Sequence, residues 1–131
     1  MTTKKFVDQI DPNDVVVEKW VYSDPVEVTR ELVNDYIKLS DDINPIHSEN
    51  YKDATIPGFM CTVLMARYFP IVENWVMATI NIRMSKPILV GSVLNARWKC
   101  IRKGSRARSF EVEVYVGDEI KQSQTFTIVR L

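Results

Sequence analysis

The sequence has few of the residues that build metal and redox sites, with one histidine and two cysteines among 131 residues. Cys61 and Cys100 are not spaced as C-x-x-C, so we expect two reduced, buried thiols and no zinc, iron or other metal site. Neither sign of charge is in excess, since Lys and Arg together number 17 and Asp and Glu also number 17. This balance gives no reason to expect nucleic acid or an anionic membrane as a partner.

Long apolar runs are also missing. No stretch approaches the roughly 20 apolar residues of a membrane span. The start of the chain, Met1 to Phe6, is polar and charged, with no signal-peptide core behind it. These features predict a cytoplasmic protein. Because 46% of the residues are hydrophobic, a disordered chain is excluded, and the length suits one domain over residues 1–131.

The first half of the chain predicts one strand followed by helices. Residues 15–22 are rich in β-branched and aromatic side chains, which favour a strand. Thr29 is a suitable N-cap for a helix that runs to Ser40 with apolar residues at helical spacing. A single helical turn is expected within the polar segment 48–55. Residues 59–69 are apolar almost all round, which is typical of a helix buried in a core.

The second half predicts four strands, because apolar and polar residues alternate with a period of two. These strands fall at about 78–85, 94–100, 110–116 and 120–131. One strand, an apolar helix and four further strands predict an α+β fold, in which an antiparallel sheet wraps around the buried helix. Such a sheet leaves an unpaired edge strand. Pairing of two edges would cover it, so we expect a homodimer.

The stretch from Asp42 to His47 carries the clearest indication of chemistry, because it places the only histidine five positions after a carboxylate. Pro45 disfavours the α conformation at Asn44, so a turn or extended backbone is expected there. Such a turn can direct Asp42 and His47 into one small volume, as acid–base catalysis on a water molecule requires. We expect the Asn44 amide to support the turn by bonding neighbouring backbone. The alternative is a helix-ending turn that carries a surface histidine.

Three segments resemble the MaoC-like hot-dog family of (R)-specific enoyl-CoA hydratases and dehydratases. Residues 39–47 are similar to the family pattern S-G-D-x-N-P-x-H, residues 57–59 to the H-G-M/F start of the central helix, and residues 86–94 to R-P-V-x-V-G-D-x-L. Asp41 stands where the family usually has glycine, and aspartate tolerates the left-handed backbone such a turn needs. Pro57 replaces the usual histidine. The resemblance implies a single hot-dog domain.

The resemblance also implies a reaction. Its substrate would be a trans-2-enoyl thioester of coenzyme A or of an acyl carrier protein, hydrated reversibly to an (R)-3-hydroxyacyl thioester without a further cofactor. Asp42 and His47 would hold the water, with Asp42 as the base and His47 as the acid or the reverse. The Gly58 backbone N–H, at the start of the buried helix, would stabilise the negative charge on the thioester oxygen. The alternative is that Gly58 is an ordinary helix-start residue after a proline.

Other functions fit parts of the sequence. A hot-dog thioesterase usually carries a carboxylate on its central helix, and residues 59–69 contain no Asp or Glu. A non-catalytic acyl-thioester-binding subunit of a heteromeric dehydratase would not need both Asp42 and His47. The basic run from Arg102 to Arg108 could contact coenzyme A phosphates or a carrier protein. Its place between two predicted strands favours a solvated hairpin tip.

Overall fold

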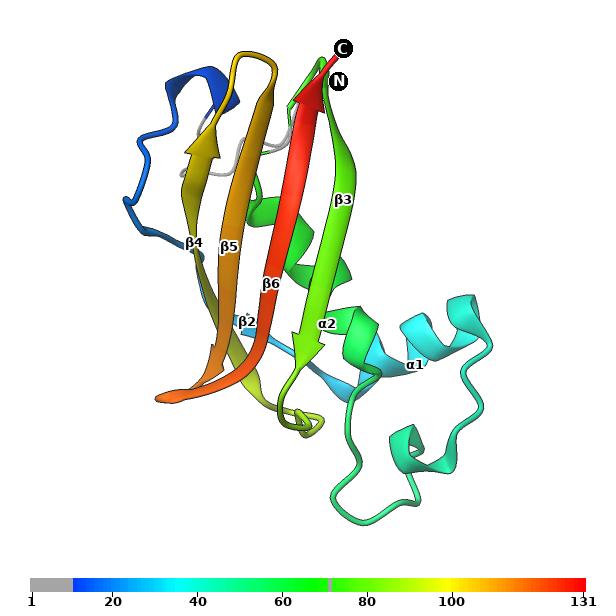
Figure 1. The fold of residues 1–131 in the computed structure, drawn as a ribbon. Helices are drawn as coiled ribbons and strands as arrows, with labels where there is room; N and C mark the ends of the chain where they lie inside the picture. The colour runs from blue at the N-terminus through cyan, green and yellow to red at the C-terminus, as the bar shows by residue number, and fades with distance from the viewer. Residues whose placement is uncertain (1–10, 71) are drawn as a thin grey trace.

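An antiparallel sheet with one helix against its inner face forms the centre of the structure (Figure 1). The computed structural model describes residues 11–70 and 72–131, so the charged start of the chain, Met1 to Phe6, lies outside the described residues. The elements are η1 (Pro12–Asp14), β1 (Val21–Tyr22), β2 (Val26–Glu27), α1 (Arg30–Ser40), η2 (Pro45–His47), α2 (Gly58–Met65), η3 (Ala66–Tyr68), β3 (Trp75–Met84), β4 (Val93–Lys103), β5 (Ala107–Val116) and β6 (Glu119–Arg130), where η denotes a 3-10 helix.

The sheet has the order β1-β4-β5-β6-β3, and β2 pairs with β4. All of these pairs are antiparallel. Strands β4, β5 and β6 follow one another through tight turns, whereas β3 crosses to the far side and pairs only with β6 among the described residues. The predicted α+β fold, with an antiparallel sheet around a helix, is confirmed.

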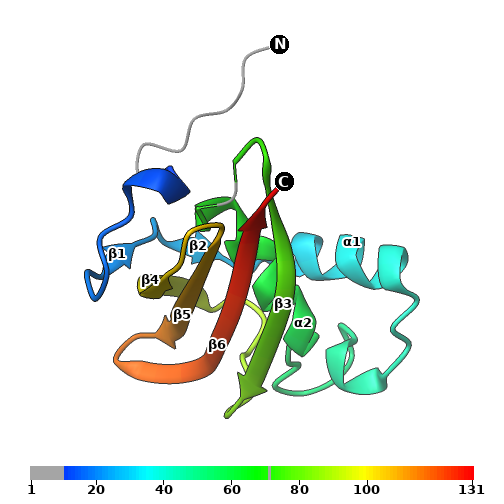
Figure 2. The same ribbon diagram turned by 45° about the horizontal axis from the view of Figure 1, so that its top comes forward.

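The core lies between α2 and the inner face of the sheet, as Figure 2 shows from a second direction. The predicted period of two is confirmed in β4, β5 and β6, whose alternate residues are buried. Three phenylalanine rings form a stack, with Phe126 4.8 Å from Phe69 and 4.9 Å from Phe110 between ring centroids. Trp98 meets Phe110 edge-on and donates its indole N–H to the Tyr68 carbonyl at 2.8 Å. This packing fixes α2 against the sheet. No helix in the described ranges is long and apolar enough to cross a membrane.

The strand predicted over residues 15–22 is wrong for most of its length. Only Val21–Tyr22 forms β1, and a second short strand, β2, follows it. Glu18 has a left-handed backbone with φ of 66°, which breaks an extended path. Val17 makes only an isolated bridge to Cys100. The helical turn predicted within 48–55 is also wrong, since residues 48–53 form bends and turns and Thr55 forms an isolated bridge to Leu89.

The helix predicted at residues 59–69 begins one residue earlier, at Gly58, and its last turn is the separate 3-10 helix η3. It is not buried all round. Phe59 and Val63 are each 51% exposed, and they lie four residues apart on one face. On the edge strand, Met84 is likewise 50% exposed. The described residues therefore leave an apolar helix face and an apolar sheet edge exposed.

Candidate functional site

The turn between α1 and η2 forms as the residue types predict. Helix α1 ends at Ser40, and its C-cap Asp41 has a left-handed backbone with φ of 55°. Asn44 is extended, with φ of −63° and ψ of 120°, and precedes Pro45 at the first position of η2. The Asn44 side-chain oxygen accepts a hydrogen bond of 3.2 Å from the Ile46 N–H. The amide thus caps η2 and fixes the direction in which the chain leaves the turn.

Asp42 and His47 lie side by side, with Oδ2 of Asp42 3.5 Å from Nε2 of His47. The other carboxylate oxygen, Oδ1, accepts a hydrogen bond of 3.2 Å from the Asn44 N–H. The side chain of Asp42 is 34% exposed and that of His47 is 11% exposed. The backbone therefore holds one oxygen of the carboxylate and leaves the other facing the imidazole at a solvent-accessible place.

The other ring nitrogen of His47 is fixed by Thr55. Nδ1 lies 2.6 Å from the Thr55 carbonyl oxygen, and a carbonyl only accepts, so Nδ1 must carry a proton. Nε2 is then the nitrogen that gains or loses a proton. The Thr55 N–H donates in turn to the Ile46 carbonyl at 3.0 Å. Two hydrogen bonds thus hold Thr55 against η2. No sequence pattern had indicated a role for Thr55.

The spacing of the pair suits a bound water. Hydrogen bonds of about 2.8 Å from one water to each polar atom would close a triangle over the 3.5 Å between Oδ2 and Nε2. A water held in this way touches two groups that can exchange protons with it. The arrangement therefore provides both a base and an acid at one point.

Arg30, the first residue of α1, holds the backbone beside His47. Its Nη1 donates to the His47 carbonyl at 2.7 Å, and its Nη2 donates to the Ser48 carbonyl at 3.4 Å. Nothing in the sequence predicted this contact, because no local pattern relates an arginine at a helix start to a carbonyl 17 positions later.

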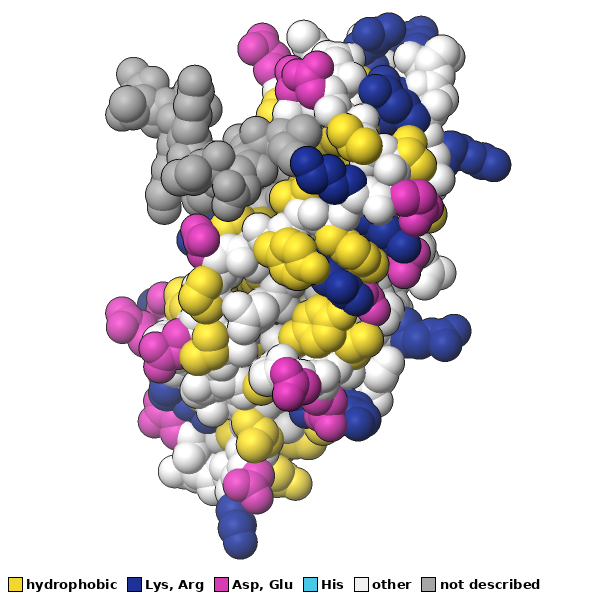
Figure 3. Space-filling view, turned by 90° about the vertical axis from the view of Figure 1, so that its left-hand side faces the viewer, with side chains coloured by type: hydrophobic (Ala, Val, Ile, Leu, Met, Phe, Trp, Pro, Cys, Tyr) yellow, Lys and Arg dark blue, Asp and Glu magenta, His cyan; other side chains and the backbone are white. Residues whose placement is uncertain are grey.

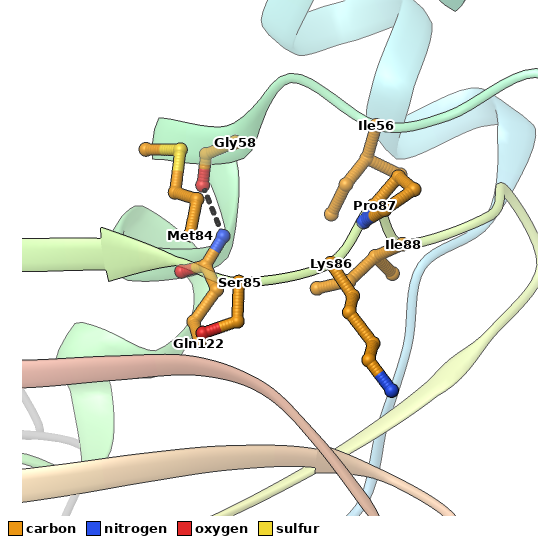
Figure 4. A pocket seen from close by; sticks show the side chains of 8 residues that line it. All are labelled: Ile56, Gly58, Met84, Ser85, Lys86, Pro87, Ile88 and Gln122. Atoms are coloured by element: carbon orange, nitrogen blue, oxygen red, sulfur yellow. Dashed lines mark hydrogen bonds between the residues drawn. The ribbon is translucent and has the colours of Figure 1, made fainter.

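Gly58 lies beside a cavity of about 210 Å³, which Figure 4 shows from close by. Because Gly58 is the first residue of α2, its N–H has no acceptor within the helix. Its carbonyl accepts a hydrogen bond of 2.9 Å from Nε2 of Gln122 on β6. The cavity is lined by Ile56, Gly58, Met84, Ser85, Lys86, Pro87, Ile88 and Gln122.

The three segments that carry the family resemblance meet at this place. The segment 54–56 runs antiparallel to 88–90, with Ile56 N–H donating to the Ile88 carbonyl at 2.8 Å and Val90 N–H to the Ala54 carbonyl at 2.9 Å. Thr55, which binds His47, is therefore fixed to the third segment and is followed three residues later by Gly58. The cavity thus adjoins the short stretch that connects the acid–base pair to α2.

The basic run at residues 102–108 forms the turn between β4 and β5, as predicted, at the opposite end of the sheet from η2 (Figure 1). Its cations bind backbone carbonyls. Lys103 donates to Asn13 at 3.1 Å, Arg106 to Arg130 at 3.0 Å, and the buried Arg108 to Pro12 at 3.0 Å. These contacts tie the turn to the rest of the chain rather than to the candidate site.

The side of the molecule shown in Figure 3 carries charges of both signs among hydrophobic side chains. Arg97 on β4 lies 3.9 Å from the centre of the Trp20 ring and forms an ion pair of 2.6 Å with Glu113. The charge of Arg97 is thus already paired within the chain.

In the ranges 11–70 and 72–131, no three His, Cys, Asp or Glu side chains are placed to hold a metal ion.

Comparison with known proteins agrees with this fold. No protein-family model matches the sequence, and no curated protein matches it. The unliganded R-hydratase PhaJ1 from Pseudomonas aeruginosa superposes with a TM-score of 0.82 at 13% identity, over 93% of this chain and 86% of that chain. A MaoC-like dehydratase from Rhodospirillum rubrum gives 0.75 at 13% identity, over 92% and 97%. The ChsH1-ChsH2 complex from Mycobacterium tuberculosis gives 0.77 at 12% identity, over 88% and 98%. The resemblance to MaoC-like hydratases and dehydratases is thus confirmed for the fold.

Proposed function

We propose that this chain adds water to the double bond of trans-2-enoyl thioesters to give (R)-3-hydroxyacyl thioesters, or catalyses the reverse dehydration. The observation that supports this most is the 3.5 Å approach of Asp42 Oδ2 to His47 Nε2, with Oδ1 and Nδ1 both engaged by the backbone. The acyl group would be carried by coenzyme A or by an acyl carrier protein, and the carrier is part of the substrate. The fold shared with R-hydratases supports the same class of reaction.

The proton transfers balance with two groups. Asp42 takes a proton from the water while the water oxygen bonds to the β-carbon. The electrons of the double bond move to the α-carbon and the thioester oxygen, and His47 donates its Nε2 proton to the α-carbon. The proton on Asp42 then passes to Nε2, 3.5 Å away, so both groups return to their first state. The net change is the addition of one water.

The negative charge on the thioester oxygen needs a hydrogen-bond donor, and we assign this part to the Gly58 N–H. The N–H is not used within α2, and a helix N-terminus carries partial positive charge. Gln122 holds the Gly58 carbonyl and so limits rotation of this peptide. A donor of this kind typically contributes about 3 to 4 kcal/mol to transition-state stabilisation.

The test follows the loss of absorbance of crotonyl-CoA with the wild type, Asp42→Asn and His47→Ala. We expect each substitution to lower the rate about 100- to 10,000-fold. Asp41→Asn is the matched control, because it makes the same chemical change one residue earlier, at an exposed left-handed position that asparagine tolerates. Folded Asp42→Asn and His47→Ala proteins with wild-type rates would refute the proposal. A wild type that binds acyl thioesters but hydrates neither coenzyme A nor carrier-linked substrates would indicate a non-catalytic subunit.

We also propose that the chain forms a homodimer through the outer edge of β3 and the exposed face of α2. Strand β3 pairs on one side only, with β6, among the described residues. Val76 on this strand is 39% exposed, and Phe59 and Val63 on α2 are each 51% exposed. Pairing with a second copy would satisfy the free strand edge and bury these side chains. One of the similar structures is itself a complex, of ChsH1 with ChsH2.

A further inference from the structure

Gly58 is held by a directly opposed pair of residues on two strands. Met84, the last residue of β3, is the register partner of Gln122 on β6. Gln122 donates to the Gly58 carbonyl at 2.9 Å, and the Met84 side chain lies against the Gly58 α-carbon, as Figure 4 shows. The space that a β-carbon at Gly58 would occupy is taken by the Met84 thioether, whose sulfur a β-carbon would strike and whose methyl carbon lies 3.0 Å from that point.

Three of the other apolar walls of the cavity are less able to move. Ile56 and Ile88 are only 4% and 2% exposed and are joined through the backbone. Pro87 is rigid at its φ angle. Met84 differs, because its side chain is unbranched and stands at the last position of β3, where it is 50% exposed in the single chain. Among the apolar walls of the cavity it is the side chain that can change its position at least cost, whereas the exposed Lys86 is paired with Glu119 at 2.9 Å.

The volume of the cavity limits what it can hold. At about 210 Å³, it is smaller than the roughly 300 to 1,000 Å³ of sites that take drug-sized ligands. A short acyl group fits such a space, and a longer one extends beyond it unless a wall withdraws. The flexible apolar wall is the thioether that covers Gly58, the residue whose N–H we assign to the thioester oxygen.

We propose that Met84 sets the acyl specificity of this site by closing the cavity beside Gly58, so that short, unbranched acyl thioesters are accepted and longer ones are excluded. This inference rests on the proposed function, because it takes the cavity as the acyl site. Met84 contacts the acyl group, Gln122 positions Gly58, and the width of the cavity is decided by the rotamer of one side chain.

Binding of saturated thioesters tests this without any reaction. Butyryl- and octanoyl-pantetheine carry the portion that coenzyme A and carrier proteins share, and they have no double bond to hydrate. We would measure their dissociation constants by calorimetry for the wild type, Met84→Ala and Ile101→Ala. Ile101 is a comparably exposed apolar residue on β4, outside the cavity. If Met84→Ala fails to fold, Met84→Val supplies a shorter side chain that suits an edge strand.

We expect the wild type to bind the butyryl thioester more tightly, and Met84→Ala to shift the ratio of the two dissociation constants at least tenfold toward octanoyl. Ile101→Ala should keep the wild-type ratio. A ratio in folded Met84→Ala within threefold of the wild type, or no binding of either thioester, would overturn the inference. Discrimination that depends on Met84 in a protein that hydrates no enoyl thioester would instead remove the proposed reaction and leave the specificity site standing.

Discussion

The Arg30 guanidinium donates a hydrogen bond of 2.7 Å from Nη1 to the backbone carbonyl of His47. It thereby connects the first residue of α1 to the residue that carries the imidazole. The same side chain reaches the Ser48 carbonyl at 3.4 Å. Since Thr55 fixes the imidazole ring and Arg30 fixes its backbone, His47 is held from two sides.

We predict that Arg30→Ala lowers kcat for enoyl-thioester hydration by roughly ten- to a hundredfold while KM changes little, because a misplacement of about 1 Å can cost that much. Arg30→Lys should recover part of the rate, since an ammonium can still donate to one carbonyl. Steady-state kinetics measure both effects. Glu31→Ala, at the next and exposed position of α1, is the control and should keep the wild-type kcat. Equal losses in Arg30→Ala and Glu31→Ala would show that Arg30 acts only on the stability of α1.

Asn44→Ala is predicted to reduce turnover more than it reduces stability. Loss of the bond from the Ile46 N–H to the Asn44 side chain removes a helix cap, which typically costs about 1 kcal/mol in free energy of unfolding. The same bond aims His47, so we expect the rate to fall more than tenfold. Urea denaturation and kinetics on one preparation give the two numbers. A rate loss no greater than that of Asn50→Ala, an exposed amide in the following segment, would contradict the prediction.

Much of the fold could be predicted because the alternation of apolar and polar residues in a strand shows which of its faces lies on the core. Residues 94–100, 110–116 and 120–131 alternate, since each strand has one face on the core. Strands β4 and β5 contain the first two ranges, and β6 contains the third except for Leu131. Residues 15–22 gave the opposite result. Their β-branched side chains suit any extended chain, whereas the left-handed backbone at Glu18 breaks the extended path and only Val21 and Tyr22 pair with β4.

The candidate site likewise has a part that could be predicted from the sequence and a part that could not. The turn from Asp42 to His47 could be predicted, because Asn44 and Pro45 determine it locally. The contacts made by Arg30 and by Gln122 span 17 and 64 positions, and nothing in either neighbourhood indicates the distant partner. Gln122 even interrupts the apolar pattern of its strand. Its burial becomes reasonable only once α2 supplies an acceptor at Gly58.

The contact between Met84 and Gly58 predicts a coupling that stability measurements can detect. Gly58→Ala should lower the free energy of unfolding by at most about 1 kcal/mol, because the new methyl group meets the far end of the flexible, half-exposed Met84 side chain, which can turn away. Adding Met84→Ala should remove the contact, so the two changes together should cost less than their sum by roughly 0.5 to 1 kcal/mol. Chemical denaturation of the four proteins measures the cycle. Additive effects would show that Met84 does not occupy this space in solution.

Burial raises the pKa of the Cys61 thiol to about 12 and also raises that of Cys100. Because the thiolate is the reactive form, neither thiol should react with a disulfide reagent at pH 8 in the folded protein, and both should react in guanidinium. A raised folded pKa stabilises the protein below the unfolded value of about 8.5. This stability is lost as the pH rises toward about 12. Cys61→Ala should make the free energy of unfolding less dependent on pH in this range. An unchanged slope of that free energy against pH would contradict the raised pKa of Cys61.

The uncovered face of α2 predicts a dimer that one charge can break. Val63 is 51% exposed on the same face as Phe59, and a buried, unpaired carboxylate there would cost several kcal/mol. We expect the wild type to be a dimer and the Val63→Asp protein to be a folded monomer. Light scattering after gel filtration measures both molecular masses. Val16→Asp, a 59% exposed valine before β1, should remain a dimer. A monomeric wild type at micromolar concentration would leave the apolar face of α2 and the edge of β3 to a different partner chain, as in a heteromeric assembly.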